Sequence, residues 1–280
     1  MNSKKVPHLF VATGATKWND PKKFPWTMGW QPNYQTEAKI YAAHILKTKP
    51  NAKIAILYQN DDYGKDYLNG FKDGLGAKGK TMIVKEASFE VTDPTVDSQM
   101  AQLQASGADT FFNITTPRHA AQAIRKAWDS GWKPVHYLNN VSASIGTTLR
   151  PAGLDKSVGL VSTQYLKDQN DKQWANDPAV VEWTAFMKKY YPDGSLAASE
   201  NFYGWCVAQT LVQVLKQAGN NLTRENVMKQ AASLKDFAPS CMLPGIKINT
   251  SATDFAPIES VRLSRFDGKD WVGFGEVMGK

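Results

Sequence analysis

The sequence contains few cysteines and histidines and no catalytic or metal-binding motif. Its two cysteines, Cys206 and Cys241, are too few for a cysteine-based metal site and allow at most one disulfide bond. The four histidines show no second histidine at a metal-ligand spacing, and no H-E-x-x-H, G-x-S-x-G or C-x-x-C motif occurs. The sequence therefore predicts no metal and no cofactor, and it offers no nucleophile–base pair for an enzyme.

Long apolar runs and basic tracts are missing as well. No apolar run approaches the ~20 residues that a membrane-spanning helix requires, so no span is predicted. Residues 1–7 lack the apolar core of a secretory signal, which indicates a cytoplasmic protein or a chain whose beginning has been removed. The net charge of +7 comes from lysines dispersed as pairs near acids, with no basic run interleaved with aromatics. We interpret this charge as solvated surface and predict no nucleic-acid partner.

Short apolar runs alternate with amphipathic segments from residue 53 onward. The runs that predict strands are 53–58, 81–89, 109–114, 134–138 and 159–163, and the helices predicted between them are 64–75, 97–106 and 119–128. Repeated strand–helix–strand units predict an α/β fold with a parallel sheet and helices on both faces. Longer helices are then predicted at 178–191, 199–218 and 224–234, followed by a strand at 246–249 and a hairpin of 260–266 and 271–274 turning at Asp267-Gly268.

The first thirty residues do not fit this alternation. Residues 6–11 predict a strand with no helix before it, like the end of a strand–helix unit whose front half is absent. Four aromatic residues follow, namely Phe24, Trp26, Trp30 and Tyr34. They suit a wall for a sugar or aromatic ligand, but we favour an interlobe strand that packs its rings in the core.

Residues 74–81 match the letters of the phosphate-loop motif G-x-x-x-x-G-K-[ST]. Phosphate binding needs a strand before the loop and a helix after it, so that backbone amides and the helix dipole face the phosphates. Here a predicted helix precedes the loop and a predicted strand follows it. We interpret Gly74, Gly76 and Gly79 as a helix end and a turn, and predict no nucleotide site.

Two histidines fall within predicted elements. His119 lies in the first turn of a predicted helix beside Arg118, which predicts that it is exposed. His136 lies in a predicted strand, which predicts a place in the core or in a pocket wall. Neither position indicates a catalytic base.

Polar residues follow the ends of several predicted strands. They are found at 60–64, 113–116 and 139–142, and Tyr63 adds an aromatic ring to the first set. Asp61 and Asp62 also suit the beginning of a helix, because acids are favourable there. A fourth set, 12–16, is rich in small residues that could offer backbone amides to an anion. Because ligands bind beyond the carboxyl ends of strands in open α/β sheets, the four sets together predict a small-molecule cleft.

Several segments resemble a known family. They are residues 6–16, the segment with Glu37 and Tyr41, which is expected to cross between two lobes, residues 53–65, residues 106–112, and the end of the chain from 243–246 to 265–269. These segments are similar to the periplasmic substrate-binding proteins of branched-chain amino acid ABC transporters, the leucine/isoleucine/valine-binding type. The resemblance covers essentially the whole chain.

The resemblance implies a two-lobed type I periplasmic binding fold, with parallel sheets flanked by helices and three crossing strands between the lobes. Residues 1–31 and 166–249 are expected to form the remainder of lobe 1, and residues 32–165 and 250–280 to form lobe 2. Lobe 1 is expected to be incomplete, with its opening strands and helices and the signal peptide preceding this chain. The implied location is periplasmic.

The resemblance also implies a function. The chain is expected to be the extracytoplasmic solute-binding component of an ABC importer, which binds a small molecule between its lobes and reports closure to a membrane permease. The alternative is a ligand-sensing receptor or regulator domain of the same fold, for amides or amino acids, and a neighbouring permease gene would separate the two. Catalysis is not expected.

The implied ligand contacts are assigned by matching positions. The loop that grips a ligand carboxylate matches Ala12, Thr13, Gly14 and Ala15; a binding tyrosine matches Tyr63; and the other strand ends supply Asn113, Thr115, Thr116, Asn140 and Ser142. An acidic residue for a ligand amine is expected near 140–142 and is missing there. Because a buried ammonium without an acceptor costs several kcal/mol, we hypothesise a small carboxylate ligand, amino acid-like or aromatic, with preference for a carboxylate without an α-amine or a neutral amide. Tyr63, Trp26 and Phe202 are candidate walls.

Overall fold

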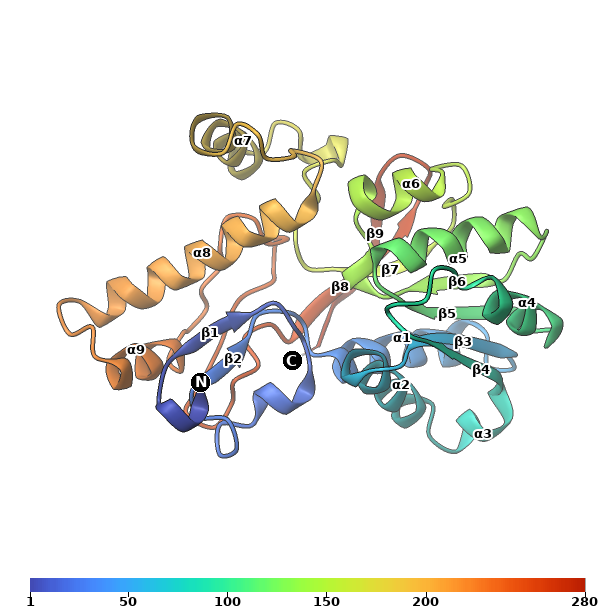
Figure 1. Cartoon of the computed structure of the whole chain (residues 1–280), viewed down its shortest axis with the longest axis horizontal. Helices are drawn as coiled ribbons and strands as arrows, with labels where there is room; N and C mark the ends of the chain where they lie inside the picture. The colour runs from blue at the N-terminus through green and yellow to red at the C-terminus, as the bar shows by residue number, and fades with distance from the viewer. Residues whose placement is uncertain (280) are drawn as a thin grey trace.

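The computed structural model describes residues 1–279. Figure 1 shows two groups of elements side by side, joined by connecting segments. The larger group, which we call the sheet lobe, contains a seven-stranded sheet, and the smaller group, the small lobe, contains a two-stranded sheet. The residue boundaries given above for lobes 1 and 2 stay a prediction.

The sheet lobe is an α/β structure. In spatial order its strands are β4 (Ile83–Phe89), β3 (Ile54–Gln59), β5 (Thr110–Ile114), β6 (Val135–Leu138), β7 (Val161–Gln164), β8 (Ser260–Phe266) and β9 (Trp271–Gly279). The first five are parallel, and β8 and β9 are antiparallel to their neighbours. The helices of this lobe are α1 (Tyr34–Thr48), α2 (Asp62–Leu75), α3 (Gly79–Met82), α4 (Asp97–Ala105), α5 (Pro117–Asp129) and α6 (Arg150–Ala152). The mostly parallel sheet flanked by helices confirms the predicted fold class.

The central strands are apolar on both sides, because helices cover both faces of the sheet. Ile54 and Ile56 of β3 pack with α1 and α2, whereas the alternating Ala55 and Leu57 pack with α4 and α5. All five residues of β5 are buried. Figure 1 shows the two helix layers on opposite sides of the sheet.

The small lobe has fewer strands. It contains β1 (His8–Val11) and β2 (Thr27–Gly29), which are parallel, and the helices α7 (Pro178–Tyr190), α8 (Ser199–Ala218) and α9 (Arg224–Ala231). Short helical turns occur in both lobes: η1 (Asn2–Lys4), η2 (Thr16–Asn19), η3 (Gly76–Lys78), η4 (Asn140–Ser142), η5 (Ile145–Leu149) and η6 (Lys172–Trp174). No helix among residues 1–279 is long and apolar enough to cross a membrane.

Of the four aromatic residues expected in the core, Trp30 and Tyr34 are buried as predicted, whereas Phe24 and Trp26 before β2 are half-buried. Trp30 is completely buried and donates its indole N–H to Thr210 Oγ1 of α8 at 2.9 Å. The ring of Tyr34 stacks on the ring of Tyr67 in α2, with centroids 4.7 Å apart. Trp30 therefore packs against the small lobe, and Tyr34 packs within the sheet lobe.

The prediction that the segment with Glu37 and Tyr41 crosses between the lobes is wrong, because this segment forms the helix α1 of the sheet lobe. Asn33 caps the start of this helix, because its side chain accepts a hydrogen bond from Thr36 N at 2.9 Å. The buried residues Ala38, Tyr41, Ala42 and Ile45 recur at helical spacing and supply the face that packs on the sheet.

Three other predicted elements end elsewhere than expected. Residues 79–82 form the short helix α3, so β4 begins at Ile83 and not at residue 81. The long helix α2, rather than a strand, still precedes the glycine-rich residues, which confirms the argument against a phosphate loop. Helix α9 ends at Ala231 rather than at residue 234. Residues 246–249 are not a strand but form a single bridge between Phe237 and Ile248. Their alternating apolar residues are buried by packing without a neighbouring strand.

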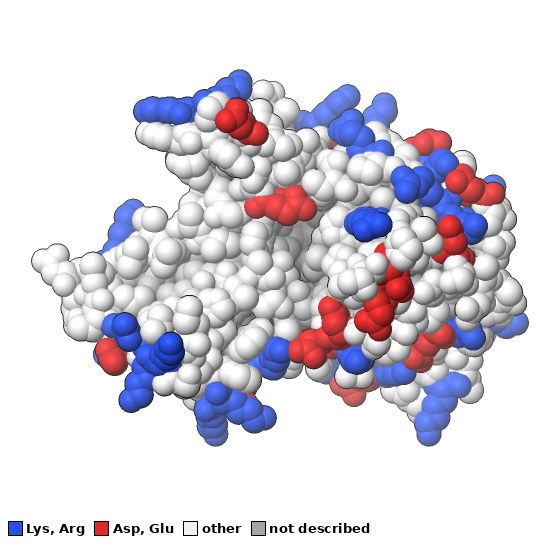
Figure 2. Space-filling view, viewed as in Figure 1, with Lys and Arg blue, Asp and Glu red and all other residues white. Residues whose placement is uncertain are grey.

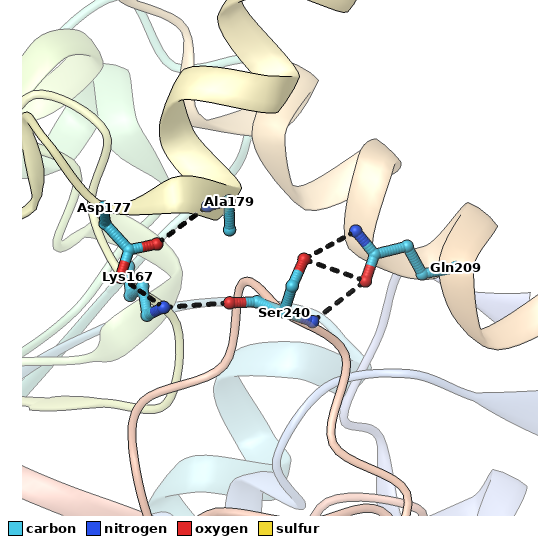
Figure 3. Close-up of polar contacts among 5 residues, drawn as sticks. All are labelled: Lys167, Asp177, Ala179, Gln209 and Ser240. Atoms are coloured by element: carbon cyan, nitrogen blue, oxygen red, sulfur yellow. Dashed lines mark hydrogen bonds and ion pairs between the residues drawn. The ribbon is translucent and has the colours of Figure 1, made fainter.

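A partly buried ion pair fixes the connection that follows β7. Lys167 Nζ lies 2.7 Å from Asp177 Oδ2 and donates a hydrogen bond to the Ser240 carbonyl at 2.9 Å. Asp177 also caps α7 by accepting from Ala179 N, and Ser240 is held by Gln209 of α8 (Figure 3). The backbone bridge between Leu166 and Met242 lies beside this cluster. The cluster therefore ties α7, α8 and residues 240–242 to one connecting segment.

Candidate functional site

A cavity of about 520 Å³ lies between the two lobes. Its walls come from Ala12 after β1, Gln31, Pro117 of α5, residues 163–169 around the end of β7, and parts of the turn after β6 and of α8. The turn contributes Asn140, Val141, Ala143 and Ser144, and α8 contributes Ser199, Glu200, Phe202 and Tyr203. Both lobes thus contribute to one hollow, at the carboxyl ends of β6 and β7. Figure 2 shows mainly uncharged atoms in the hollow between the lobes, with a group of acidic atoms at its edge and the basic side chains on the outer surfaces.

A buried carboxylate supports the wall formed after β6. Glu37 of α1 is 1% exposed and accepts hydrogen bonds from Tyr41 OH and Tyr67 OH, both at 2.6 Å. It also accepts from the backbone N–H of Asn140 at 2.9 Å. Burial raises the pKa of Glu37, although these hydrogen bonds oppose the rise. Through Asn140, the network fixes the position of the turn that lines the cavity.

Three amide side chains of the wall carry a buried polar atom without a hydrogen-bond partner. These atoms are Asn140 Nδ2, Gln164 Nε2 and Gln169 Oε1. Most buried polar atoms in native proteins are paired, so unpaired atoms on a cavity wall suit a site that a ligand or water completes. Two donors and one acceptor on a wall that also contains Leu166 and Phe202 can bind a small molecule with a polar end and an apolar body.

Two acidic residues also line the cavity, and the sequence interpretation missed them. Asp168 accepts hydrogen bonds from Ile145 N at 3.0 Å and from Asn170 N at 2.8 Å, and burial raises its pKa. Glu200 in the first turn of α8 is exposed. An acid is therefore available to a ligand amine, although none lies at 140–142. The rule of strand ends could have found Asp168, because it follows β7 just as Asn140 follows β6.

The predicted site residues divide into three groups in the structure. Ala12 and Asn140 line the interlobe cavity. Thr13, Ala15 and Tyr63 line a second hollow of about 460 Å³, together with Lys17, Trp18, Asp61 and Asp62. Gly14, Asn113, Thr115, Thr116 and Ser142 line neither hollow.

The residues of the third group are mostly engaged inside the protein. Asn113 and Thr115 are completely buried, and Thr115 Oγ1 donates to Asn113 Oδ1 at 2.6 Å. Ser142 Oγ donates to the Thr115 carbonyl, and Thr116 Oγ1 donates to Gln59 Oε1 at 3.1 Å. A Cβ on Gly14 would lie 2.0 Å from the Pro32 carbonyl oxygen, so only glycine fits there. These residues hold the strand ends and loops together.

Tyr63 joins the second hollow to this buried group. Its hydroxyl donates to the Thr115 carbonyl at 3.0 Å or to Asn139 Oδ1 at 2.9 Å, and burial raises its pKa well above the usual value. Its ring lies edge-on to Tyr34, with centroids 5.3 Å apart. Of the other candidate walls, Phe202 lines the interlobe cavity, and Trp26 lines neither hollow.

The predicted exposure of His119 is wrong. This side chain is 2% exposed, with Nε2 2.9 Å from the Asp93 carbonyl and the ring 4.6 Å from that of Phe89. The loop before α4 covers the first turn of α5, which a helical pattern alone does not reveal. His136 is buried as predicted, and burial lowers its pKa to about 3. It is neutral and bonded to Asn113 Nδ2 at 3.2 Å.

Asp171 lies behind the cavity, where the segment after β7 meets β9. It is 2% exposed and accepts hydrogen bonds from Gln173 N at 2.9 Å and Trp271 N at 3.2 Å. Burial raises its pKa to about 6, from an ordinary value of 3.8. Between these pH values the folded protein retains a proton that the unfolded chain releases, so the contribution of Asp171 to stability falls as pH rises from about 4 to 6.

We expect this linkage to disappear in Asp171→Asn. The difference in unfolding free energy between the natural protein and this variant should shrink by about 1–3 kcal/mol from pH 4 to pH 6.5, and then stay constant. Urea unfolding at several pH values measures it. The exposed Asp193→Asn is the control, and a difference that does not change with pH would contradict the assignment.

The comparisons with known proteins agree on one family. The model of the family described as "Periplasmic binding protein" matches residues 1–270. A curated relative, the Leu/Ile/Val-binding protein homolog 8 of Brucella abortus, is 23% identical over 154 residues, which are 54% of this chain and only 36% of the relative. The chain thus matches little more than a third of the length of that relative.

Solved structures show the same fold at low identity. A branched chain amino acid ABC transporter protein from Thermus thermophilus, solved with bound valine, superposes with a TM-score of 0.85 at 15% identity, over 100% of this chain and 74% of its own. A fatty acid ABC transporter substrate-binding protein from Thermomonospora curvata gives a TM-score of 0.73 at 20% identity, over 96% and 68%. The α/β lobes, the hollow between them and the family match lead to one conclusion: the chain belongs to the periplasmic binding protein family and has its type I fold.

Proposed function

We propose that this protein is the extracytoplasmic solute-binding component of an ABC importer, with a membrane permease as its partner. Its ligand is a small carboxylate, amino acid-like or aromatic, held in the interlobe cavity without chemical change. The observation that carries the proposal is the wall of that cavity, where unpaired amide groups of Asn140 and Gln164 stand beside apolar side chains from both lobes. Amide donors suit the oxygens of a carboxylate.

The ligand classes in this proposal are broader than the sequence alone suggested. The preference for a ligand without an amine was based on the missing acid at 140–142. Asp168 and Glu200 remove that reason, because both lie on the cavity wall. The fold neighbours described above are named for valine and for fatty acids, and both ligands carry a carboxylate on an apolar body. The carboxylate is therefore the common element of the proposal. Of the site residues predicted from the sequence, Ala12 and Asn140, which line the cavity, remain proposed contributors to its binding.

Calorimetric titration with matched pairs tests the proposal. Each pair consists of an acid and the alcohol in which a CH₂OH group replaces its carboxylate. The acids are leucine, 4-methylpentanoate, phenylalanine and 3-phenylpropanoate. We expect at least one acid to bind at least tenfold more tightly than its alcohol, because the alcohol leaves an amide donor unpaired. Leucine against 4-methylpentanoate then shows whether Asp168 or Glu200 recognises the amine.

A variant of the wall locates the binding. Gln164→Met keeps the size of the side chain but removes the amide, and should weaken binding of the best acid about tenfold. Gln217→Met, exposed near the end of α8, is the matched control and should bind normally. Equal affinities of all acids and alcohols, or no effect of Gln164→Met, would contradict the proposal.

A further inference from the structure

A third hollow, of about 360 Å³, lies in the sheet lobe at the opposite end of the strands from the interlobe cavity. It is lined by residues 132–136, which lead into β6, by Lys156 and residues 158–160, which lead into β7, by one side of α5, and by Arg265 of β8. The interlobe cavity lies beyond the other ends of β6 and β7. The hollow is therefore separate from the site proposed above.

The walls of this hollow are apolar and aromatic. Trp128 is 47% exposed, Val135 40% and Val158 55%, which is unusual for three large apolar side chains around one depression. Trp132 forms a fixed wall, because its indole N–H donates to the Ala108 carbonyl at 2.9 Å and its ring packs 5.1 Å from that of Phe111. A flat or chain-like apolar group would cover these surfaces without a change of the wall.

The charged residues of the hollow are all cationic. They are Lys133, Lys156 and Arg265, and no aspartate or glutamate lines it. Lys156 is paired with Asp129 at 2.6 Å, outside the lining. Within residues 1–279, Lys133 and Arg265 have no carboxylate oxygen within 4.0 Å. The guanidinium of Arg265 lies over the ring of Phe274 at 5.7 Å, which limits its positions.

We propose that this hollow is a second binding site, for an amphiphilic monoanion with a flat or chain-like apolar body and one carboxylate or sulfonate. The apolar body packs between Trp128, Trp132 and Val158, and the anionic group pairs with Lys133 and Arg265. The volume lies in the range of small-ligand pockets, which combine apolar walls with a few polar groups. The oxygens of one carboxylate or sulfonate can pair with both cations that lack a partner.

Fluorine NMR of the full chain labelled with 5-fluorotryptophan tests this site with 2-naphthoate as the probe. The resonances of Trp128 and Trp132 are assigned through Trp128→Phe and Trp132→Phe. We expect both resonances to shift saturably when 2-naphthoate is added. The neutral 2-naphthalenemethanol should give a dissociation constant at least tenfold higher. The readout is local, so binding in the interlobe cavity, or its failure, does not affect it.

Charge reversal separates a built site from general adsorption. Lys133→Glu with Arg265→Glu changes two exposed side chains and should raise the dissociation constant at the Trp128 resonance at least tenfold. Lys188→Glu with Lys189→Glu, on α7 in the small lobe, gives the same change of net charge and should have no effect. Non-saturable shifts, equal binding of the neutral probe, or an equal effect of the two double variants would each overturn the proposal.

Discussion

Replacement of Glu37 by alanine should destabilise the protein by about 3–5 kcal/mol. The change removes the acceptor of three buried donors, Tyr41 OH, Tyr67 OH and Asn140 N. Tyr67 OH and Asn140 N lose their partner, whereas Tyr41 OH can still donate to the Leu138 carbonyl at 3.0 Å. A buried donor that loses its acceptor costs about 1–3 kcal/mol, and losses within one network are less than additive. Urea unfolding measures the effect. Glu182→Ala, an exposed glutamate on α7, should change stability by less than about 0.5 kcal/mol.

The pH dependence of Glu37→Gln tests the same network in a different way. Burial raises the folded-state pKa of Glu37 above 4.5, so the folded protein retains this proton longer than the unfolded chain. The stabilising contribution is therefore present at low pH and is lost as pH rises through the raised pKa. The cost of Glu37→Gln relative to the natural protein should be larger at pH 5 than at pH 8. A cost that is larger at pH 8 would contradict the assignment.

Much of the sheet lobe follows from local patterns in the sequence. The strands β3, β5 and β6 are short apolar runs between helices with polar faces, and both features are determined by nearby residues. Helix α1 was missed because its segment carries Glu37 in the middle of its buried face. A buried acid makes a helix look less amphipathic in the sequence. Glu37 can be buried only because Tyr41, Tyr67 and the backbone N–H of the distant Asn140 donate hydrogen bonds to it.

The candidate site was predicted only in part, for a topological reason. The strand-end rule identified Asn140, because it follows β6 directly. The rule could not place Phe202 on the same wall, because Phe202 lies in the helix α8 and follows no strand. This helix reaches the cavity only because the two lobes pack together. The rule also treated Asn113 and Thr115 as accessible to the ligand. Both are buried below the edge of the sheet, where their side chains hydrogen-bond to each other. Local sequence shows where a strand ends, but not which side chain of the rim faces outward.

Removal of the disulfide between Cys206 and Cys241 should destabilise the protein by about 4 kcal/mol. The two residues are 35 positions apart and both are completely buried. Cross-linking a loop of this length restricts the unfolded chain, and the loop-entropy relation gives about 4 kcal/mol. The bond also has a structural consequence, because the Cys241 carbonyl accepts from Lys167 N at 2.9 Å. It thus fastens α8 to the segment that carries the Lys167–Asp177 ion pair.

Thermal unfolding with and without dithiothreitol tests this bond against simple loss of packing. The natural protein should unfold about 10 °C lower under reducing conditions. The variant Cys206→Ala with Cys241→Ala should unfold at the lower temperature whether or not reductant is present, because truncating two small side chains costs less than losing the cross-link. Gln164→Met, which leaves the cysteines intact, should keep the full response to reductant. If the natural protein unfolds at the same temperature with and without dithiothreitol, the disulfide does not stabilise the protein by restricting the unfolded chain. Helix α8 would then be held by packing alone.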